Sequence, residues 1–274
     1  MTQEKKDVAL YGDESHFNEI VTYAFIIIPQ KNHELVEASV SKVKKIYGLD
    51  EGAKIHCREL FNKYARSKTQ FSEFTDEKVL KFFDEIMIQS FLAGARGWVG
   101  YLDTRKAPAT LLFESEELTK PLTLDLGNLK TKMHLCFQAA IGPLTHIFPH
   151  SRVESYVDGD KTKILYLNRN RQVDSLRSFF PVEHNNERFL PKPVHGLKPL
   201  FLDLADVLAY SAARGLAEAS TTNRNSFISI VKSLDPGYSE VVFDHSSAGG
   251  AMFSIRAFDP DDRVKSYINQ FIKL

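Results

Sequence analysis

Residues 7–29, DVALYGDESHFNEIVTYAFIIIP, contain two apolar runs with a short polar stretch between them. The runs at 8–13 and 20–28 are rich in β-branched and aromatic residues, and the turn-like ESHFNE separates them. This pattern predicts a strand, a short connection and an antiparallel partner. Pro29 closes the second strand. The first strand therefore brings two adjacent acids, Asp13 and Glu14, to its end.

Outward from this hairpin, helical and extended patterns alternate along the chain. Apolar residues recur every three or four positions at 32–47, before Gly48, and at 79–91, after Thr75 as an N-cap, which predicts two helices. The intervening residues 53–74 are interpreted as a polar, irregular stretch. Further strands are predicted at 95–103, 152–158 and 240–244, and further helices at 128–147, 200–219 and 261–274, while 160–180 is compatible with a helix.

Length and composition limit the class of protein. The 274 residues, 43% hydrophobic and 26% charged, are typical of a globular protein with a substantial core. No internal repeat, low-complexity tract or linker is visible, so we predict a single domain over 1–274. Thirty-five basic residues balance thirty-five acidic ones, so no whole-molecule field attracts a polyanion. A nucleic-acid site must therefore be a local patch.

Several function classes are disfavoured by what the sequence lacks. Cys57 and Cys136 have no paired spacing, which argues against a disulfide framework or a cysteine-bound zinc and favours a reduced, cytoplasmic setting. No stretch resembles a signal peptide or reaches the roughly 20 apolar residues that cross a bilayer, so no membrane partner is expected. Phosphate-binding GxxxxGK[ST] and dinucleotide-binding GxGxxG motifs are also missing.

Acids recur where predicted strands end and where a predicted helix begins: Asp13, Asp158, and the pair Asp203 and Asp206. Each acid alone also has a structural reading, as a turn or cap residue, and the pair suits the positive end of a helix dipole. Because strand ends converge at one edge of an α/β sheet, the carboxylates are expected to meet. They repel one another unless a divalent cation lies between them, and oxygen ligands favour Mg²⁺ or Mn²⁺. Such a site suits phosphodiester hydrolysis.

Three motifs carry a resemblance to a known family. The segments YGDES, YVD and LFLDLADVLAY resemble domain-of-unknown-function family 3800 of bacteria and phages, whose members open with Asp-Glu-Ser-Gly and close with Leu-Gln-hydrophobic-Ala-Asp. That family looks like a branch of the ribonuclease H-like superfamily of metal-dependent nucleases. The resemblance implies an α/β fold with a central mixed β-sheet flanked by α-helices and helical insertions. It implies a core at about 7–215 and a C-terminal extension at 216–274.

The resemblance also implies residue roles. Asp13, Asp158 and Asp206 take the positions of metal ligands. Glu14 matches the first motif, but a regular strand points it to the opposite side. In KIHCREL, His56 and Glu59 become candidates for contacting phosphate or completing the ligand set.

Two positions depart from the family pattern. His16 replaces the usual glycine and would place an imidazole, which titrates near neutrality, within reach of the metal edge as a proton carrier; an exposed loop histidine is the alternative. Asp203 replaces the usual glutamine and either adds a fourth carboxylate to the metal site or caps the helix.

A basic segment follows the strand that ends at Asp158. Its cations are candidates for contacting a phosphate backbone, and its aromatic and amide side chains suit a single strand; a solvated helix face is the alternative. The residues concerned are Lys161, Lys163, Arg169 and Arg171, with Tyr166, Asn168 and Asn170 between them and Lys192 and Lys198 beyond.

Two hypotheses for function remain. The first is a Mg²⁺- or Mn²⁺-dependent nuclease acting on DNA or RNA, and the three acidic positions favour it. The second is a non-catalytic ribonuclease H-like binding or interaction module in phage defence or a mobile element, which the neutral net charge favours. The sequence leaves open a homodimer or a partner protein.

Overall fold

The computed structural model describes residues 8–104, 109–113, 122–141, 151–158, 183–184, 187–188, 192–194, 200–218, 238–244 and 252–258. The predicted helix at 261–274 and the basic segment at 160–180 lie outside these residues. So do residues 142–147 of the helix predicted at 128–147.

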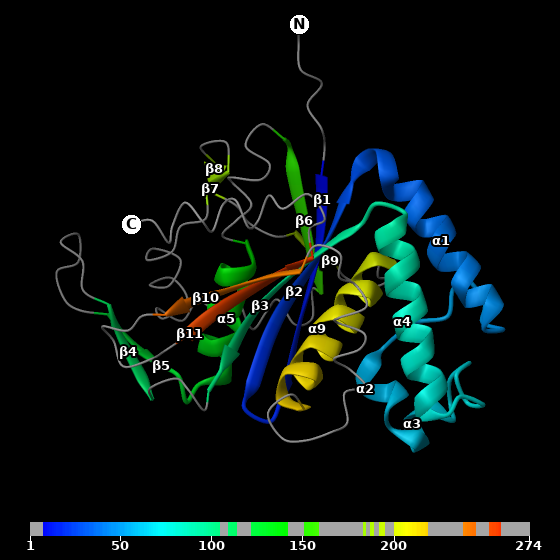
Figure 1. The fold of residues 1–274 in the computed structure, drawn as a ribbon, viewed down its shortest axis with the longest axis horizontal. Coiled ribbons are helices and arrows are strands. Elements are labelled where there is room, and N and C mark those ends of the chain that lie inside the picture. The colour runs from blue at the N-terminus through cyan, green and yellow to red at the C-terminus, as the bar shows by residue number, and fades with distance from the viewer. Residues whose placement is uncertain are drawn as a thin grey trace, which may run out of the picture.

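A mixed sheet forms the centre of the fold, with helices on both faces, which confirms the predicted α/β class (Figure 1). Its strand order is β10-β11-β3-β2-β1-β6-β9. The antiparallel strands are β1 (Val8–Phe17), β2 (Ile20–Pro29), β3 (Arg96–Asp103), β11 (Met252–Phe258) and β10 (Tyr238–Asp244). The strands β6 (Val153–Asp158) and β9 (Lys192–Val194) pair in parallel beside β1. Two small hairpins, β4 (Thr110–Phe113) with β5 (Leu122–Asp125) and β7 (Glu183–His184) with β8 (Glu187–Arg188), stand apart.

The first hairpin is longer than the sequence suggested. The stretch ESHFNE was predicted as a connection, but β1 continues through Ser15 to Phe17, which pairs with Ile20. The turn is reduced to Asn18 and Glu19, and Asn18 has a positive φ of 52°. Asparagine tolerates this left-handed conformation, so a tight turn replaces the longer loop. The side chains of the motif therefore alternate between the two faces of a regular strand.

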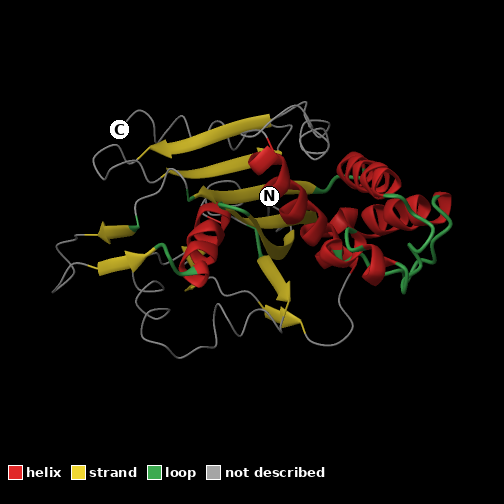
Figure 2. Cartoon of the chain, turned by 90° about the horizontal axis from the view of Figure 1, so that it is seen from below, coloured by secondary structure: helices red, strands yellow, loops and turns green. Residues whose placement is uncertain are grey.

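Helices cover the sheet unequally (Figure 2). On one face, α9 (Leu200–Glu218) packs on β1 and β2, and α1 (His33–Ile46) and α4 (Asp76–Leu92) extend the same core. On the other face, α5 (Leu129–Ile141) packs on β2 and β3. Alternate residues of β2 divide accordingly: Ala24 and Ile26 belong to the α9 core, whereas Tyr23 and Phe25 contact Phe137 of α5.

The segment at 53–74 is structured, contrary to the expectation of an irregular stretch. It contains the short helices α2 (Cys57–Leu60) and α3 (Lys63–Arg66) and buries apolar side chains, among them Ile55, Leu60 and Phe71. Phe71 packs edge-on against Phe82 of α4, which anchors the segment to the helical layer. Ile55, Leu60 and Phe71 are each almost fully buried, which holds the segment against the core.

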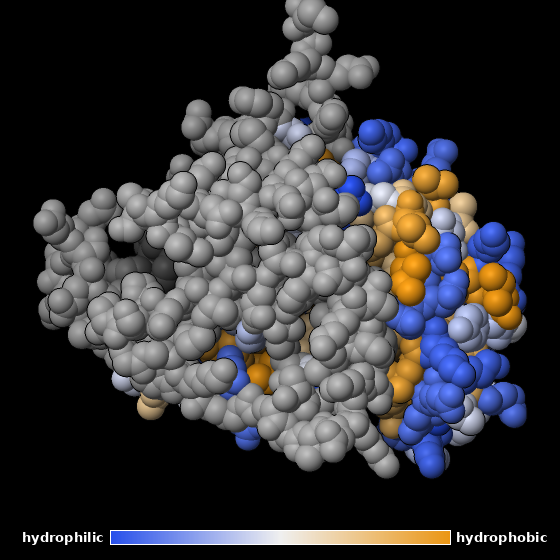
Figure 3. Space-filling model, viewed as in Figure 1, coloured by the Kyte–Doolittle hydropathy of each residue, from blue (hydrophilic) through white to orange (hydrophobic). Residues whose placement is uncertain are grey.

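The outer surface over α1 and α4 is a mosaic of hydrophilic and hydrophobic residues (Figure 3). Leu35, Ile46 and Leu92 are the exposed large apolar side chains on these two helices. Across the described residues, none of the helices combines the length and the apolar character that a membrane span requires.

Candidate metal and phosphate site

A pocket of about 510 Å³ opens where β1, the start of α9 and the segment at 52–71 meet. Both acidic and basic side chains line this pocket. Its lining consists of Asp13 from β1, Leu202, Asp203 and Asp206 from α9, Gly52, Ala53, Lys54, Ile55, His56 and Glu59 before and within α2, and Lys68, Thr69, Gln70 and Phe71. The pocket thus brings together residues from three distant parts of the chain.

Asp13 and Asp206 are the buried acids of this pocket, with residue exposures of 7% and 9%. Oδ1 of Asp13 accepts the backbone N–H of Glu14 at 2.8 Å, and Oδ2 of Asp206 accepts the backbone N–H of Cys57 at 2.9 Å. The hydroxyl of Thr22 on β2 donates to the carbonyl of Ala209 at 2.9 Å and so fixes α9 on the sheet. The backbone N–H groups of Glu14 and Cys57 therefore orient the carboxylates of Asp13 and Asp206 before any ligand binds.

Strand alternation separates Asp13 from its neighbours in the motif. Gly12 lies on the α5 face, because a Cβ at this position would meet the ring of Phe25 at 2.6 Å. Asp13 consequently points to the α9 face, and Glu14 and His16 point away from it. Neither Glu14 nor His16 lines the pocket. The structure thus does not bring His16 within reach of the carboxylates, contrary to the expectation, because the strand does not end before this residue.

The backbone pairing of β6 with β1 shows where Asp158 lies in the sheet. Gly12 of β1 is paired with Val157 of the parallel strand β6, and Asp13 and Asp158 each come one residue later. Their strands therefore carry the two residues to the same level of the sheet. The side chain of Asp158 is outside the described part of the structure.

Asp203 lies one turn before Asp206 on α9 and faces the same pocket. Its Oδ2 accepts the backbone N–H of Ile55 at 3.1 Å. The two acids of α9 thereby hold the N–H groups of Ile55 and Cys57, two residues apart in the segment that precedes and opens α2. Asp203 has a structural role in this contact, as well as access to the pocket.

Lys44 of α1 is buried behind this wall, with a residue exposure of 1%. Its Nζ donates to the carbonyls of Glu51 at 2.9 Å and of Ala53 at 2.7 Å. Burial lowers the pKa of the Lys44 ammonium, and the negative charges of Asp203 and Glu51 act in the opposite direction. Sequence analysis missed Lys44 because its helical pattern gives no sign that one lysine of a basic helix face is turned inward.

Cys57 opens α2 with its backbone N–H bound to Asp206. Burial raises the pKa of its thiol well above 9.0, and the charges of Asp206 and Asp13 and a hydrogen bond with Asp206 raise it further. The thiol is therefore neutral near pH 7 and is not an activated nucleophile. Cys57 and Cys136 are both buried and unbridged.

His56 and Glu59 form a pair at the pocket wall. Nδ1 of His56 lies 3.0 Å from Oε1 of Glu59, and both side chains are about half exposed, at 49% and 52%. Both predicted residues therefore line the pocket that Asp13 and Asp206 occupy. Lys54 and Lys68, which the sequence analysis did not single out, add positive charge to the same wall.

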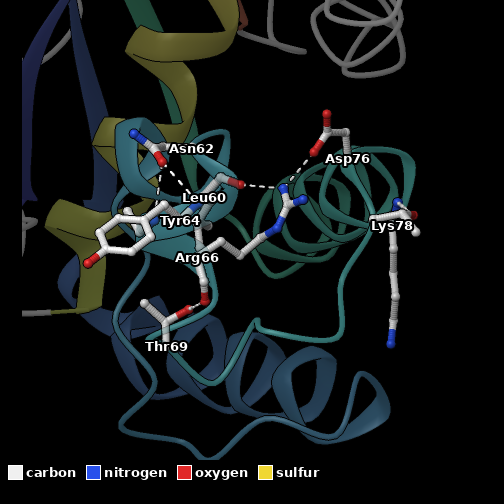
Figure 4. A network of polar contacts seen from close by, with 9 residues as sticks. Leu60, Asn62, Tyr64, Arg66, Thr69, Asp76 and Lys78 are labelled. Atoms are coloured by element: carbon white, nitrogen blue, oxygen red, sulfur yellow. Dashed lines mark hydrogen bonds and ion pairs between the residues drawn. The ribbon is translucent and has the colours of Figure 1, made fainter.

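The wall at 60–76 is held by a polar network (Figure 4). Nη1 of the buried Arg66 donates to the carbonyl of Leu60 and, at 2.6 Å, to Asp76 at the start of α4. The side chain of Asn62 accepts the N–H groups of Tyr64 and Ala65 and caps α3. These contacts fix the short helices that surround the pocket.

The acidic residues fit a divalent cation in part. Asp13 and Asp206 supply buried carboxylate oxygens, which Mg²⁺ and Mn²⁺ prefer. No group of three His, Cys, Asp or Glu residues capable of holding a metal occurs among the described residues, and the third predicted ligand, Asp158, has no described side chain. The other predicted phosphate contacts, Lys161, Arg169 and Arg171, also fall outside the described residues.

Comparison with known proteins gives no match to any family model, curated protein or solved structure.

Proposed function

We propose that this chain is a metal-dependent nuclease of ribonuclease H-like fold, as its resemblance to domain-of-unknown-function family 3800 implies. One observation carries the proposal: Asp13 and Asp206 converge on a pocket that also presents Lys54, His56 and Lys68. Buried carboxylates can bind a divalent cation, and the neighbouring lysine and histidine side chains can bind a phosphate group of the substrate. The substrate would be a phosphodiester of DNA or RNA.

In the proposed reaction, Asp13, Asp158 and Asp206 would hold Mg²⁺ or Mn²⁺. A bound divalent ion would supply an activated water and would neutralise charge that develops on phosphorus. Lys54 and Lys68 attract and orient the phosphate oxygens at the pocket wall.

His56 is the group best placed to carry a proton in this pocket. Glu59 holds its Nδ1, which leaves Nε2 to donate or accept a proton. This assignment replaces His16, which strand alternation places on the opposite face of β1 from Asp13.

The test measures cleavage of labelled single- and double-stranded DNA and RNA with Mg²⁺, with Mn²⁺ and with chelator. Asp13→Asn and Asp206→Asn are compared with Glu73→Gln, which removes an exposed carboxylate outside the pocket. We expect metal-dependent cleavage by the wild type and by Glu73→Gln, with a loss of at least ~100-fold in the two pocket variants. Cleavage that survives chelation or both pocket substitutions contradicts the proposal.

The second hypothesis, a non-catalytic binding module, predicts a different result in the same experiment. All four substrates would stay intact under every metal condition, while binding of nucleic acid or of a partner persists. The inward orientation of the two acids favours catalysis, because buried like charges are costly without a cation to bind.

A further inference from the structure

An exposed aromatic side chain stands beside a lysine of the pocket. Tyr64 of α3 is 72% exposed. Nζ of Lys68 lies 4.0 Å from the centroid of the Tyr64 ring and donates a hydrogen bond to the Tyr64 hydroxyl at 2.9 Å. Lys68 also lines the pocket that contains Asp13 and Asp206. A flat ring and a cation are thus presented together next to the buried acids.

The ring of Tyr64 rests on a rigid support. Asn62 accepts the backbone N–H of Tyr64 at 3.1 Å, and Arg66 ties the same short helix to Leu60 and Asp76 (Figure 4). Thr69 closes the following turn by donating to the carbonyl of Arg66 at 2.8 Å. Because the backbone is already fixed, a ligand that stacks on the ring pays little additional ordering entropy.

The segment that carries Tyr64 is locally basic in a chain of zero net charge. Residues 54–68, KIHCRELFNKYARSK, contain five Lys and Arg residues and one Glu. Arg66 is buried and paired with Asp76, whereas Lys54, Arg58, Lys63 and Lys68 are exposed. Alternation of basic and aromatic side chains is the pattern with which proteins bind single strands.

The burial of Asp13 and Asp206 favours a single strand over a duplex as the substrate. Asp13 and Asp206 are 7% and 9% exposed, so a scissile phosphate must enter the pocket to approach them. A duplex is stiff, with a persistence length of about 150 base pairs, and keeps its bases stacked inside the helix. An unpaired strand can bend into the pocket and turn a base onto an exposed ring.

We propose that Tyr64 and Lys68 form a subsite for an unpaired nucleotide next to the scissile phosphate, which makes single-stranded nucleic acid the substrate. Tyr64 stacks on the base, and Lys68 contacts the phosphate on the pocket side. This inference rests on the proposed nuclease function and specifies its substrate class. Stacking uses the π-face that every base possesses, so the subsite accepts DNA and RNA without strong sequence preference.

The test measures binding separately from cleavage. Labelled single-stranded DNA and RNA of 12 nucleotides, and the corresponding duplexes, are titrated with the full chain in chelator, and fluorescence anisotropy is recorded. The variants are Tyr64→Ala, Tyr64→Phe and Lys68→Met. Leu92→Ala and Lys81→Met serve as controls, because Leu92 is exposed and apolar and Lys81 is an exposed lysine of α4, both outside the pocket.

We expect single strands to bind at least ~10-fold more tightly than duplexes, and Tyr64→Ala to lower single-strand affinity by roughly tenfold. Tyr64→Phe keeps the ring and most of the affinity, and Lys68→Met lowers both the affinity and its salt dependence. The controls bind as the wild type does, and an unchanged melting temperature of Tyr64→Ala excludes misfolding. Equal affinity for duplexes, or no effect of Tyr64→Ala, overturns the inference.

Failure of the subsite and failure of the nuclease assignment give different results. If Tyr64→Ala weakens single-strand binding while no substrate is cleaved in any metal, the subsite stands and the nuclease function fails. If Asp13→Asn abolishes cleavage while Tyr64→Ala alters neither binding nor the preference for single strands, the nuclease function stands and the subsite fails.

Discussion

Asp13 of β1 and Asp206 of α9 line the same pocket, although one belongs to the first strand of the sheet and the other to a late helix. Asp206 also accepts the backbone N–H of Cys57 at 2.9 Å. The first residue of the short helix α2 thus fixes one of these two acids. Two adjacent buried carboxylates have an energetic cost that a cation would relieve.

Metal binding should stabilise the protein without any substrate. We expect Mg²⁺ or Mn²⁺ at about 100 times its dissociation constant to add about 2.7 kcal/mol, which raises the melting temperature by several degrees. Asp13→Asn and Asp206→Asn should lose most of this shift and melt no lower than the wild type in chelator, because one of two like charges is gone. Differential scanning calorimetry with and without metal measures both effects. An equal shift in the wild type and both variants would show that the metal binds elsewhere.

Adjacent acids in the first motif should differ sharply in function. Asp13 faces α9 and the pocket, whereas Glu14 lies on the opposite face of β1. Asp13→Asn should lower cleavage at least ~100-fold, and Glu14→Gln should leave it within about threefold of the wild type. The cleavage rates of Asp13→Asn and Glu14→Gln at saturating metal show which face of β1 carries the functional acid. Equal losses would contradict the assigned orientation of β1.

Lys44→Met should loosen the pocket wall. The substitution removes two hydrogen bonds to the carbonyls of Glu51 and Ala53 and the cation beside Asp203. We expect a loss of about 2 kcal/mol in the free energy of unfolding and weaker metal binding. Urea denaturation measures the first effect and titration calorimetry the second.

The neighbouring residue Lys45 provides a matched control. It forms an exposed ion pair with Glu51, and Lys45→Met should cost less than about 1 kcal/mol. If Lys45→Met destabilised the protein as much as Lys44→Met does, the buried position of Lys44 would have no special role.

Cys57 should contribute to loss of stability in alkali. Burial raises its pKa in the folded protein above the ordinary value of 9.0, so above about pH 9 the unfolded chain releases a proton that the folded chain retains. The contribution of the thiol to the free energy of unfolding is therefore complete below pH 9, and it falls by up to about 1.4 kcal/mol per pH unit above pH 9. Cys57→Ser removes the ionisation and should reduce the slope of unfolding free energy against pH between 8.5 and 10.5. An unchanged slope in urea titrations would show that the thiol ionises equally in both states.

Local patterns were sufficient to predict many of the longer regular elements. The apolar spacing placed helices at 32–47 and 79–91, and the structure has α1 at His33–Ile46 and α4 at Asp76–Leu92 with Thr75 as its N-cap. Strands were predicted correctly at 95–103 and 152–158, which correspond to β3 and β6. Short segments were less predictable, because α2 and α3 have only four residues each and take their stability from burial of Leu60 and from the Arg66 network.

Sequence alone placed acids in a first strand and at the start of a late helix, because period and composition are local properties. Only the tertiary structure decided which acids meet. Asp13 reaches the pocket and Glu14 and His16 do not, because β1 continues past the motif and its side chains alternate. Lys44, Cys57, Lys54 and Lys68 join the site through packing between segments far apart in the chain, which no local pattern encodes.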